Sequence, residues 1–500
     1  MRWSTGLDSV CSPAKVGVQQ HRQEDWTPGF AGEREGAESA LSDLVCISPV
    51  DGREYARRAL TPPAEVDRAV ERARRAQREW AQVPIEERCK MALRFIATME
   101  RLNAQIVPEL AWQMGRPVRY GGELGSLRDR VRGMVAIAEE ALAPVEPEPG
   151  AGTRRYVARV PAGLVLVIAP WNYPFLTAAN AIMPALIAGN AVLLKHASQT
   201  LLAGERFAEA LAKAGLPDGV FANLFLSHEE TARLLGSGLV DHATFTGSVE
   251  GGRAIERAAA GSFTTLTLEL GGKDPAYVRE DADLGAAIEG LVDGSFYNSG
   301  QSCCGVERIY VHEAVWKPFL DGFVEATQRY RLGDPLDAET SLGPMASAKG
   351  AEQVRRQIAE ALKAGASVHV ERQLFPADTG GSAYLMPQVL TGVDHGMTVM
   401  REETFGPVVG IMPVGGDEEA VRLMNDSAYG LTASIWTRDL PAADRLAPLV
   451  EAGTVFMNRC DYLDPLLAWT GVKDSGRGAS LGRWGFESVT RPRSFHLRTA

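Results

Sequence analysis

Apolar and polar residues alternate along the chain in blocks that predict a parallel α/β protein. Short apolar runs have the length of buried strands and lie at residues 164–169, 191–195, 221–226, 242–246 and 264–270. The segments between them carry apolar residues at helical spacing, and the clearest, 202–214, is ended by Gly215 and Pro217. Strands alternating with helices predict a sheet covered on both faces, with ligands at the carboxyl ends of its strands.

A second α/β series begins after residue 271 and continues to about residue 466. Its first strands and helices are expected, in turn, at residues 276–278, 284–297, 306–312 and 317–330. Helical periodicity also precedes the first series, at 63–80 and from 85 to about 143. The chain therefore predicts two α/β units that follow a helical segment.

Three segments fall outside both series. Residues 1–44 mix small, polar and charged residues without periodicity, which is typical of a poorly ordered N-terminal extension. Residues 153–160 and 491–498 look like exposed strands, whose unpaired edges need partners.

Composition and charge narrow the class of protein. At 500 residues the chain is long enough for more than one hydrophobic core. The net charge of −11 gives no basic field that would favour nucleic acid or anionic lipid. The six cysteines form no CxxC motif, so we expect neither a disulfide scaffold nor a metal site. These features suit a cytoplasmic protein.

One uncharged stretch, residues 160–194, is long enough to cross a membrane. Prolines and asparagines interrupt it at Pro161, Pro170, Asn172, Pro174, Asn180, Pro184 and Asn190. This punctuation predicts a buried core of short elements rather than a membrane span. No apolar run follows Arg2, so a secretory signal is not expected either.

Three side chains are candidates for chemistry. Cys303 ends the sequence Gly-Gln-Ser-Cys, in which the glycine lets backbone amides approach a substrate atom; the alternative is an inert buried thiol. Glu269 ends an apolar strand, where burial suits a general base; the alternative is a structural carboxylate paired with Lys273. Asn172 follows the strand 164–169 and can either donate its amide to an oxyanion or cap the next helix.

A glycine-containing turn at residues 245–252 joins a strand to a helix. Its backbone N–H groups and the helix N-terminus suit a pyrophosphate, although the turn does not match the GxGxxG fingerprint.

Together these motifs resemble the aldehyde dehydrogenase superfamily. The resemblance covers about residues 45–500 and includes further motifs at 194–198, 402–407, 453–458 and 476–478. The segments 195–200 and 469–478 are most similar to the branch grouped with succinate-semialdehyde dehydrogenases. The resemblance implies an α/β fold with a Rossmann-type cofactor domain, an α/β catalytic domain and a small β oligomerisation flap.

The resemblance also divides the chain into domains. It implies a dinucleotide-binding domain at 45–143 and 162–271 and a catalytic domain at 272–466. The segments 144–161 and 485–500 are expected to join subunits in a homodimer or homotetramer.

The family's functional residues map onto this sequence. By resemblance, Cys303 is the nucleophile, Glu269 is the base, and Asn172 with the backbone N–H of Cys303 forms the oxyanion hole. Cys304 is then a bystander. The implied cofactor site consists of Trp171, Lys195, Ser198, Gly247, Ser248, Glu403 and Phe405. Within it, Lys195 grips the adenosine ribose, Ser248 contacts phosphate, Glu403 contacts the nicotinamide ribose and Phe405 supports the ring. The implied reaction oxidises an aldehyde to its acid with NADP or NAD, through a thioester that Glu269-activated water hydrolyses.

Three positions depart from the family pattern. His196 stands where proline is usual, and Ser198 stands where glutamate would repel the 2′-phosphate of NADP, so we expect NADP to be accepted. Asn180 stands where succinate-semialdehyde enzymes have an arginine, which argues against a carboxylated aldehyde. The substrate tunnel is expected to include Tyr173, Thr177, Asn180, Tyr297 and Ser302.

Two other classes compete with this interpretation. The sequence Gly-Ala-Ser-Leu-Gly at 478–482 matches the GxSxG elbow of serine hydrolases, but the residues before Ser480 do not form an apolar strand. A non-catalytic binding protein would be expected to lack Cys303 or Glu269, and both are present.

Overall fold

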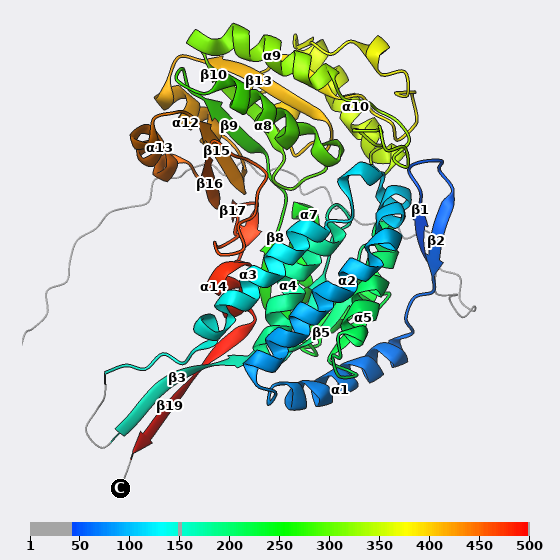
Figure 1. Cartoon of the computed structure of the whole chain (residues 1–500), viewed down its shortest axis with the longest axis vertical. Coiled ribbons are helices and arrows are strands. Elements are labelled where there is room, and N and C mark those ends of the chain that lie inside the picture. Colours follow the sequence, from blue (N-terminus) through cyan, green and yellow to red (C-terminus); the bar gives the residue numbers. More distant parts are fainter. Residues whose placement is uncertain (1–42, 149–152, 499–500) are drawn as a thin grey trace, which may run out of the picture. The chain divides into compact units, whose positions relative to one another are not determined.

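A six-stranded sheet forms the core of the first α/β unit (Figure 1). The computed structural model describes residues 43–148 and 153–498 of the chain. The sheet has the order β18-β8-β7-β4-β5-β6, in which only β18 is antiparallel to its neighbour. Its strands are β4 (Leu164–Ile168), β5 (Ala191–Lys195), β6 (Phe221–Asn223), β7 (His242–Thr246), β8 (Thr265–Glu269) and β18 (Gly476–Arg477).

Helices cover both faces of this sheet because alternate side chains of each strand point to opposite faces. On β4, Leu164, Leu166 and Ile168 join one core, whereas Val165 and Val167 join the other. The first core contains α1 (Pro63–Trp80), α6 (His228–Gly236) and α7 (Val249–Ala259). The second contains α2 (Ile85–Met114), α3 (Leu124–Leu142), α4 (Pro174–Ala188) and α5 (Leu201–Lys213). The uncharged stretch is thus buried core, as its prolines and asparagines predicted.

A seven-stranded sheet forms the core of the second unit, in the order β11-β12-β13-β10-β9-β15-β16. Only β11 is antiparallel to its neighbour. The strands are β9 (Asp274–Val278), β10 (Val306–His312), β11 (Ser367–Val368), β12 (Gln388–Thr391), β13 (Val408–Val414), β15 (Thr432–Trp436) and β16 (Thr454–Met457). The helices of this unit are α8 (Leu284–Phe296), α9 (Trp316–Gln328), α10 (Ala348–Lys363), α11 (Thr398–Arg401), α12 (Asp417–Asn425) and α13 (Leu440–Leu446).

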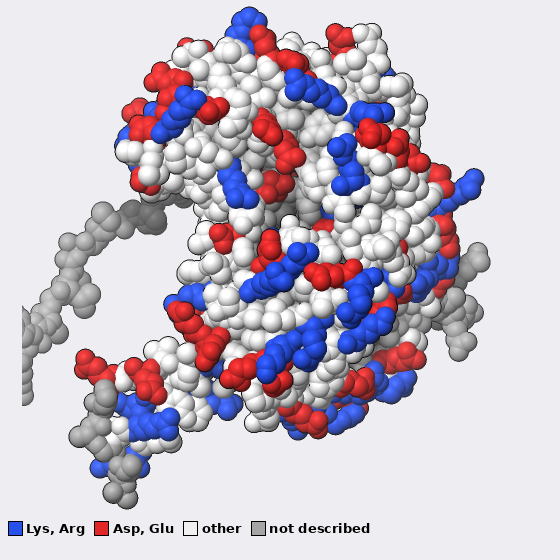
Figure 2. Space-filling model, in the orientation of Figure 1, with Lys and Arg blue, Asp and Glu red and all other residues white. Residues whose placement is uncertain are grey.

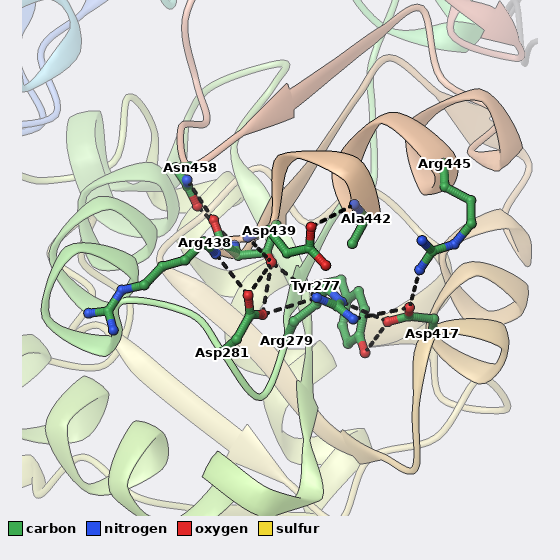
Figure 3. Close-up of polar contacts among 10 residues, drawn as sticks. Tyr277, Arg279, Asp281, Asp417, Arg438, Asp439, Ala442, Arg445 and Asn458 are labelled. Atoms are coloured by element: carbon green, nitrogen blue, oxygen red, sulfur yellow. Dashed lines mark hydrogen bonds and ion pairs between the residues drawn. The ribbon is translucent and has the colours of Figure 1, made fainter.

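A polar network joins the end of β9 to the helices beside it (Figure 3). Arg279 Nε donates to Asp417 Oδ1 at 2.9 Å, and the Tyr277 hydroxyl donates to the same oxygen at 3.0 Å. Arg445 of α13 approaches the other oxygen at 3.3 Å. One carboxylate at the start of α12 therefore ties β9 and two helices together.

Small paired strands complete the fold. β1 (Leu44–Ile47) pairs with β2 (Glu54–Arg58), and β14 (Tyr429–Gly430) pairs with β17 (Val472–Lys473). The expected outlying strands are β3 (Thr153–Pro161) and β19 (Thr490–Arg498), which follows α14 (Gly482–Ser488). β3 and β19 pair with each other, antiparallel, over their whole lengths.

The structure confirms the α/β class and changes two details of the sequence interpretation. β6 has only three residues of the expected strand 221–226, because Leu224 and Phe225 bond to β5 and to Thr61 outside the ladder. Leu44 already belongs to β1, and residues 1–42 of the expected extension lie outside the described residues. Within the described ranges, no helix is both long and apolar enough to cross a bilayer.

Candidate active site

A strained loop after α8 presents Cys303. Asn298 and Ser299 have φ of 53° and 57°, a left-handed conformation that is costly for residues with a side chain. Gln301 fixes the loop, because its amide donates to Asn298 O at 3.0 Å and accepts from Ala346 N at 2.8 Å. Gly300 has no room for a side chain, since a Cβ there would lie 2.3 Å from Gly406 O. The loop is therefore held in one conformation with the thiol at its end.

Two cavities meet at this thiol. The first, here called the Tyr297 cavity, has a volume of about 560 Å³ and runs between α3, α4 and α8. The second, here called the Trp171 cavity, has a volume of about 310 Å³ and runs between the ends of β4 and β7 and the loop at 403–405. Cys303 and Glu269 line both cavities, together with Thr246 and Leu270. A group in either cavity can thus reach the same thiol and the same carboxylate.

Glu269 is a buried carboxylate without a cationic partner within ion-pair distance. Burial raises the pKa of its carboxyl, and the nearby hydroxyls of Ser480 and Thr246 oppose that shift. Thr246 Oγ1 donates to Oε2 at 3.3 Å, while Oε1 has no hydrogen-bond partner. The alternative of a pair with Lys273 is wrong, because Lys273 pairs with Glu307 instead. A free oxygen and a raised pKa are properties of a general base.

Asn172 lies beside the Cys303 loop. Its side-chain Nδ2 donates to Gln301 O at 3.2 Å, two residues before the thiol. The alternative of a helix cap is wrong: Glu123 accepts from the N–H groups of Phe175 and Leu176 at the start of α4. The N–H of Cys303 bonds to no acceptor among the described residues. The Asn172 side-chain amide and the Cys303 backbone N–H are thus two hydrogen-bond donors next to the thiol.

Five of the seven predicted cofactor residues line the Trp171 cavity: Trp171, Gly247, Ser248, Glu403 and Phe405. The rings of Trp171 and Phe405 meet edge to face, with centroids 5.5 Å apart. Ser248 also caps α7, because its hydroxyl accepts from Gly251 N at 3.1 Å. Burial and the neighbouring Glu307 raise the pKa of Glu403 to about 8, and its Oε1 accepts from Gly272 N at 3.2 Å.

A buried ion pair supports the loop that carries Glu403 and Phe405. Glu307 of β10 accepts from the N–H groups of Thr404 and Phe405, both at 2.9 Å, and pairs with Lys273. Lys273 also donates to the Thr404 hydroxyl at 3.0 Å. Sequence reasoning did not identify Glu307, although an acidic residue inside an apolar strand was a visible signal.

Lys195 and Ser198 do not line the Trp171 cavity; they lie at the end of β5 and in the short 3₁₀ turn Ser198–Thr200 after it. Lys195 is partly buried, and burial lowers its pKa. Its ammonium has no hydrogen bond or ion pair with any described residue. His196 points elsewhere: it is buried, its Nε2 lies 3.1 Å from Pro174 O, and burial lowers its pKa to about 4.

All five expected tunnel residues, Tyr173, Thr177, Asn180, Tyr297 and Ser302, line the Tyr297 cavity. Cys304 is buried there, and its thiol donates to Asp461 Oδ1 at 2.9 Å. Ser302 Oγ donates to the same oxygen at 2.9 Å. The sequence analysis did not identify Asp461, which accepts hydrogen bonds from both Cys304 and Ser302.

Buried charges of the Tyr297 cavity were also missed. Arg130 of α3 is 6% exposed and donates to Asn180 Oδ1 at 2.9 Å. Glu123, which also lines the cavity, pairs at 2.5 Å with Arg116 behind it, and Arg116 donates to Asn172 O at 2.7 Å. Arg130 lies on the face of α3 that also carries Leu127, Val131 and Met134, so an arginine within an apolar stripe was the available signal.

The serine-hydrolase alternative finds no support in the geometry. Ser480 is buried and its hydroxyl has no hydrogen-bond partner. His496, the only histidine after it in the sequence, is exposed on β19. A serine nucleophile needs a hydrogen-bonded base, which is missing here. Among residues 43–148 and 153–498, no group of three or more metal-binding side chains comes together.

Comparisons with known proteins agree with this geometry. A family model described as the aldehyde dehydrogenase family matches residues 37–495. Betaine aldehyde dehydrogenase 1 of Rhizobium meliloti is 35% identical over 448 residues, which cover 88% of this chain and 91% of that protein. Succinate-semialdehyde dehydrogenase [NADP(+)] 1 of Mycobacterium tuberculosis is 33% identical over 447 residues, 88% of this chain and 97% of that protein. The crystal structure of PnpE in complex with nicotinamide adenine dinucleotide superposes with a TM-score of 0.87, at 30% identity, over 92% of this chain and 94% of that chain.

The chain belongs to the aldehyde dehydrogenase family. It has the aldehyde dehydrogenase fold, and it oxidises an aldehyde to the carboxylic acid while NAD or NADP is reduced. The family, fold, activity and cofactors expected from the resemblance are thus confirmed.

Proposed function

We propose that Cys303 is the nucleophile of this oxidation, that Glu269 is the base, and that Asn172 and the N–H of Cys303 bind the oxyanion. The observation that carries the proposal is that two cavities, one for each reactant, meet at Cys303 and Glu269. The unpaired Glu269 Oε1 and the two available donors beside the thiol support the other roles.

These groups account for the chemistry in two stages. The Cys303 thiolate adds to the aldehyde carbon, and the oxyanion that forms is stabilised by about 3 kcal/mol for each well-placed donor. The nicotinamide, when bound, supplies the hydride acceptor that turns the adduct into a thioester. Glu269 then takes a proton from water, which attacks the thioester carbonyl, and the acid leaves as the thiolate is restored.

The residues of the Trp171 cavity fit a dinucleotide. Gly271 is one such feature, because a Cβ there would lie within 2.5 Å of the Glu403 carboxylate, so only glycine leaves the space open. We propose that Trp171, Gly247, Ser248, Glu403 and Phe405 hold the nicotinamide half of the cofactor. Lys195 and Ser198 then hold the adenosine ribose, a role that the unpaired ammonium of Lys195 supports.

NADP is proposed as a cofactor at least as good as NAD. No acidic side chain of the described residues lies within ion-pair distance of the Lys195 ammonium, which is therefore available to meet a 2′-phosphate. Ser198 is exposed and neutral, so it does not repel that phosphate.

The remaining proposals concern the whole protein. The domain division given above is proposed unchanged from residue 45 onward, because all strands of the six-stranded sheet except the short β18 precede residue 271 and all strands of the seven-stranded sheet follow it. A homodimer or homotetramer and a cytoplasmic location are proposed as well. The relatives named above act on betaine aldehyde and on succinate semialdehyde, which carry opposite charges, so both charge classes are candidate substrates.

A panel of aldehydes assayed with each cofactor tests the proposed reaction. Cys303→Ala is expected to abolish aldehyde-dependent reduction of NAD and NADP while cofactor binding, followed by fluorescence quenching, persists. Cys304→Ala is the matched control and should keep most of the activity, since Cys304 donates to Asp461 away from the reacting carbon. Loss of activity in Cys304→Ala with retention in Cys303→Ala would reassign the nucleophile.

A further inference from the structure

Arg130 is a buried guanidinium without an acidic partner. It is 6% exposed, and no carboxylate of the described residues lies within ion-pair distance of it. Its guanidinium donates one hydrogen bond to a described residue, from Nη1 to Asn180 Oδ1 at 2.9 Å. Burial lowers its pKa, and Glu269 is the first of the charges that oppose this. Burying a charge without a partner costs free energy. Such a charge is expected where a bound ligand supplies the opposite charge.

Asn180 adds a second unsatisfied donor at the same place. It is 2% exposed, and its Nδ2 has no hydrogen-bond partner. Because Oδ1 of the same amide already accepts from Arg130, the free N–H group lies next to the guanidinium. Buried donors without acceptors are rare in folded proteins and need an explanation. Both residues line the Tyr297 cavity, which also contains Cys303.

The carboxylates of this cavity do not neutralise Arg130. Glu123 is paired with Arg116, and Asp461 accepts from Cys304 and Ser302. Asp129, which is exposed, and Asp293 also line the cavity, but neither lies within ion-pair distance of Arg130. The Glu269 carboxylate is nearby yet beyond ion-pair distance.

We propose that Arg130 and Asn180 bind a carboxylate carried by the aldehyde substrate, so that the enzyme oxidises semialdehydes of dicarboxylic acids. A carboxylate offers two acceptor oxygens, which match guanidinium and amide donors side by side, and it supplies the charge that the guanidinium lacks. The inference rests on the proposed aldehyde oxidation and names its substrate class. An aldehyde with an ammonium group would place a second cation beside Arg130 and is disfavoured.

Three four-carbon aldehydes test this: butanal, 4-oxobutanoate and 4-aminobutanal. The wild-type enzyme is expected to use 4-oxobutanoate at least tenfold better than the other two, measured as kcat/KM. In Arg130→Met the ratio of kcat/KM for 4-oxobutanoate to that for butanal should fall by roughly 30- to 100-fold, mainly through KM. The matched control is Arg132→Met, an exposed arginine of the same helix, which should keep the ratio.

A second variant guards against misfolding. Asn180→Asp keeps an acceptor for Arg130 and adds a negative charge, so it should lower the same ratio while the protein remains folded by circular dichroism. An equal fall in kcat for butanal and 4-oxobutanoate in Arg130→Met, with a displaced pH profile, would mean that Arg130 acts through Glu269 and would overturn the proposal. A wild-type preference for 4-aminobutanal would also overturn it.

Calorimetric binding of succinate separates this inference from the proposed function. Wild-type protein should bind succinate, the product of 4-oxobutanoate, and Arg130→Met should bind it at least tenfold more weakly. If no aldehyde is oxidised but succinate binds in this Arg130-dependent way, the proposed reaction fails and the carboxylate site stands. If aldehydes are oxidised and succinate binds equally to both proteins, only the carboxylate site fails.

Discussion

At the scale of single residues, Glu269 combines burial with one unsatisfied oxygen. Its raised pKa means that part of the carboxyl is protonated at a pH where an ordinary glutamate is fully ionised. Only the ionised form can take a proton from water. The hydrolysis step should therefore accelerate as the pH rises through this raised pKa and level off above it.

Glu269→Gln removes this acceptor and keeps the volume of the side chain. We expect a burst of reduced cofactor followed by a steady state at least a hundredfold slower than wild type, because hydride transfer does not need the base. Rapid-mixing absorbance at 340 nm checks both phases. Equal slowing of the burst and the steady state would remove Glu269 from the role of base.

Ser198 offers a second test at this scale. Ser198→Glu places a carboxylate near Lys195, and two like charges some ~4 Å apart cost about 1–4 kcal/mol, depending on the local dielectric. We expect kcat/KM for NADP to fall at least tenfold and that for NAD to change much less. Ser237→Glu, which adds the same charge at another exposed position, is the control. A similar fall with both cofactors would contradict the proposed contact.

At the scale of elements, the Asp417 network should make stability depend on pH. Hydrogen bonds from Arg279 and Tyr277 outweigh partial burial and lower the pKa of Asp417. A carboxyl with a lowered folded pKa contributes its stability above the unfolded value and loses it as the pH falls through the folded value.

Asp417→Asn should lower the free energy of unfolding by about 1–2 kcal/mol at neutral pH, a range that allows for the partial exposure of the pair. The difference from wild type should begin to shrink below about pH 4, the ordinary pKa range of an aspartate in the unfolded chain, and should vanish once the pH falls below the lowered pKa of folded Asp417. Urea unfolding followed by circular dichroism measures this. Glu418→Gln, the exposed neighbour, is the control; a difference that persists at low pH would assign the effect to packing rather than charge.

Elements and motifs were largely predictable from the sequence, whereas contacts between distant segments were not. Apolar runs alone located β4, β5 and β7, since parallel strands that are buried on both faces consist almost entirely of apolar residues. The alternative roles for Glu269 and Asn172 could be decided only by contacts between residues far apart in the sequence. Lys273 pairs with Glu307 and not with Glu269, and Glu123 rather than Asn172 accepts from the start of α4. The sequence likewise could not show which distant side chain contacts Asn180.

Asn180 was interpreted from the sequence as the absence of a carboxylate-binding arginine. The structure brings a guanidinium to the same position from α3, 50 residues earlier. A pattern read along one helix cannot show which side chain a neighbouring helix supplies, because that depends on tertiary packing. The substrate specificity of such a cavity therefore depends on the side chains that two packed helices supply together.

At the scale of the whole molecule, β3 and β19 form a two-stranded ribbon. The ladder runs from Thr153 opposite Arg498 to Pro161 opposite Thr490, and Tyr156 stacks on Phe495 with centroids 4.5 Å apart. The outer edge of β19 has no strand partner among the described residues. An isolated two-stranded ribbon is only marginally stable, so this edge is expected to pair with another subunit.

Light scattering should therefore give a mass of two or four 53.9-kDa chains at micromolar concentration. Removing residues 490–500, which include β19, should shift the mass toward that of one chain. A single-chain mass for the full-length protein would contradict the proposed assembly. On the face drawn in Figure 2, lysine and arginine are interspersed with aspartate and glutamate, which suits specific contacts between like subunits.

The hydrogen bond from Cys304 to Asp461 has a consequence for chemical labelling. A hydrogen bond with the neighbouring Cys303 thiol, burial and the Asp461 carboxylate raise the pKa of Cys304 well above its ordinary value, so its sulfur stays protonated and unreactive. Cys303 opens into two cavities. An electrophile such as iodoacetamide should therefore alkylate one sulfur of the adjacent pair, and tandem mass spectrometry of that peptide would place the adduct on Cys303. Cys303 is thus the expected site of attachment for activity-based probes, and the adjacent Cys304 thiol serves as an unreactive control in the same peptide.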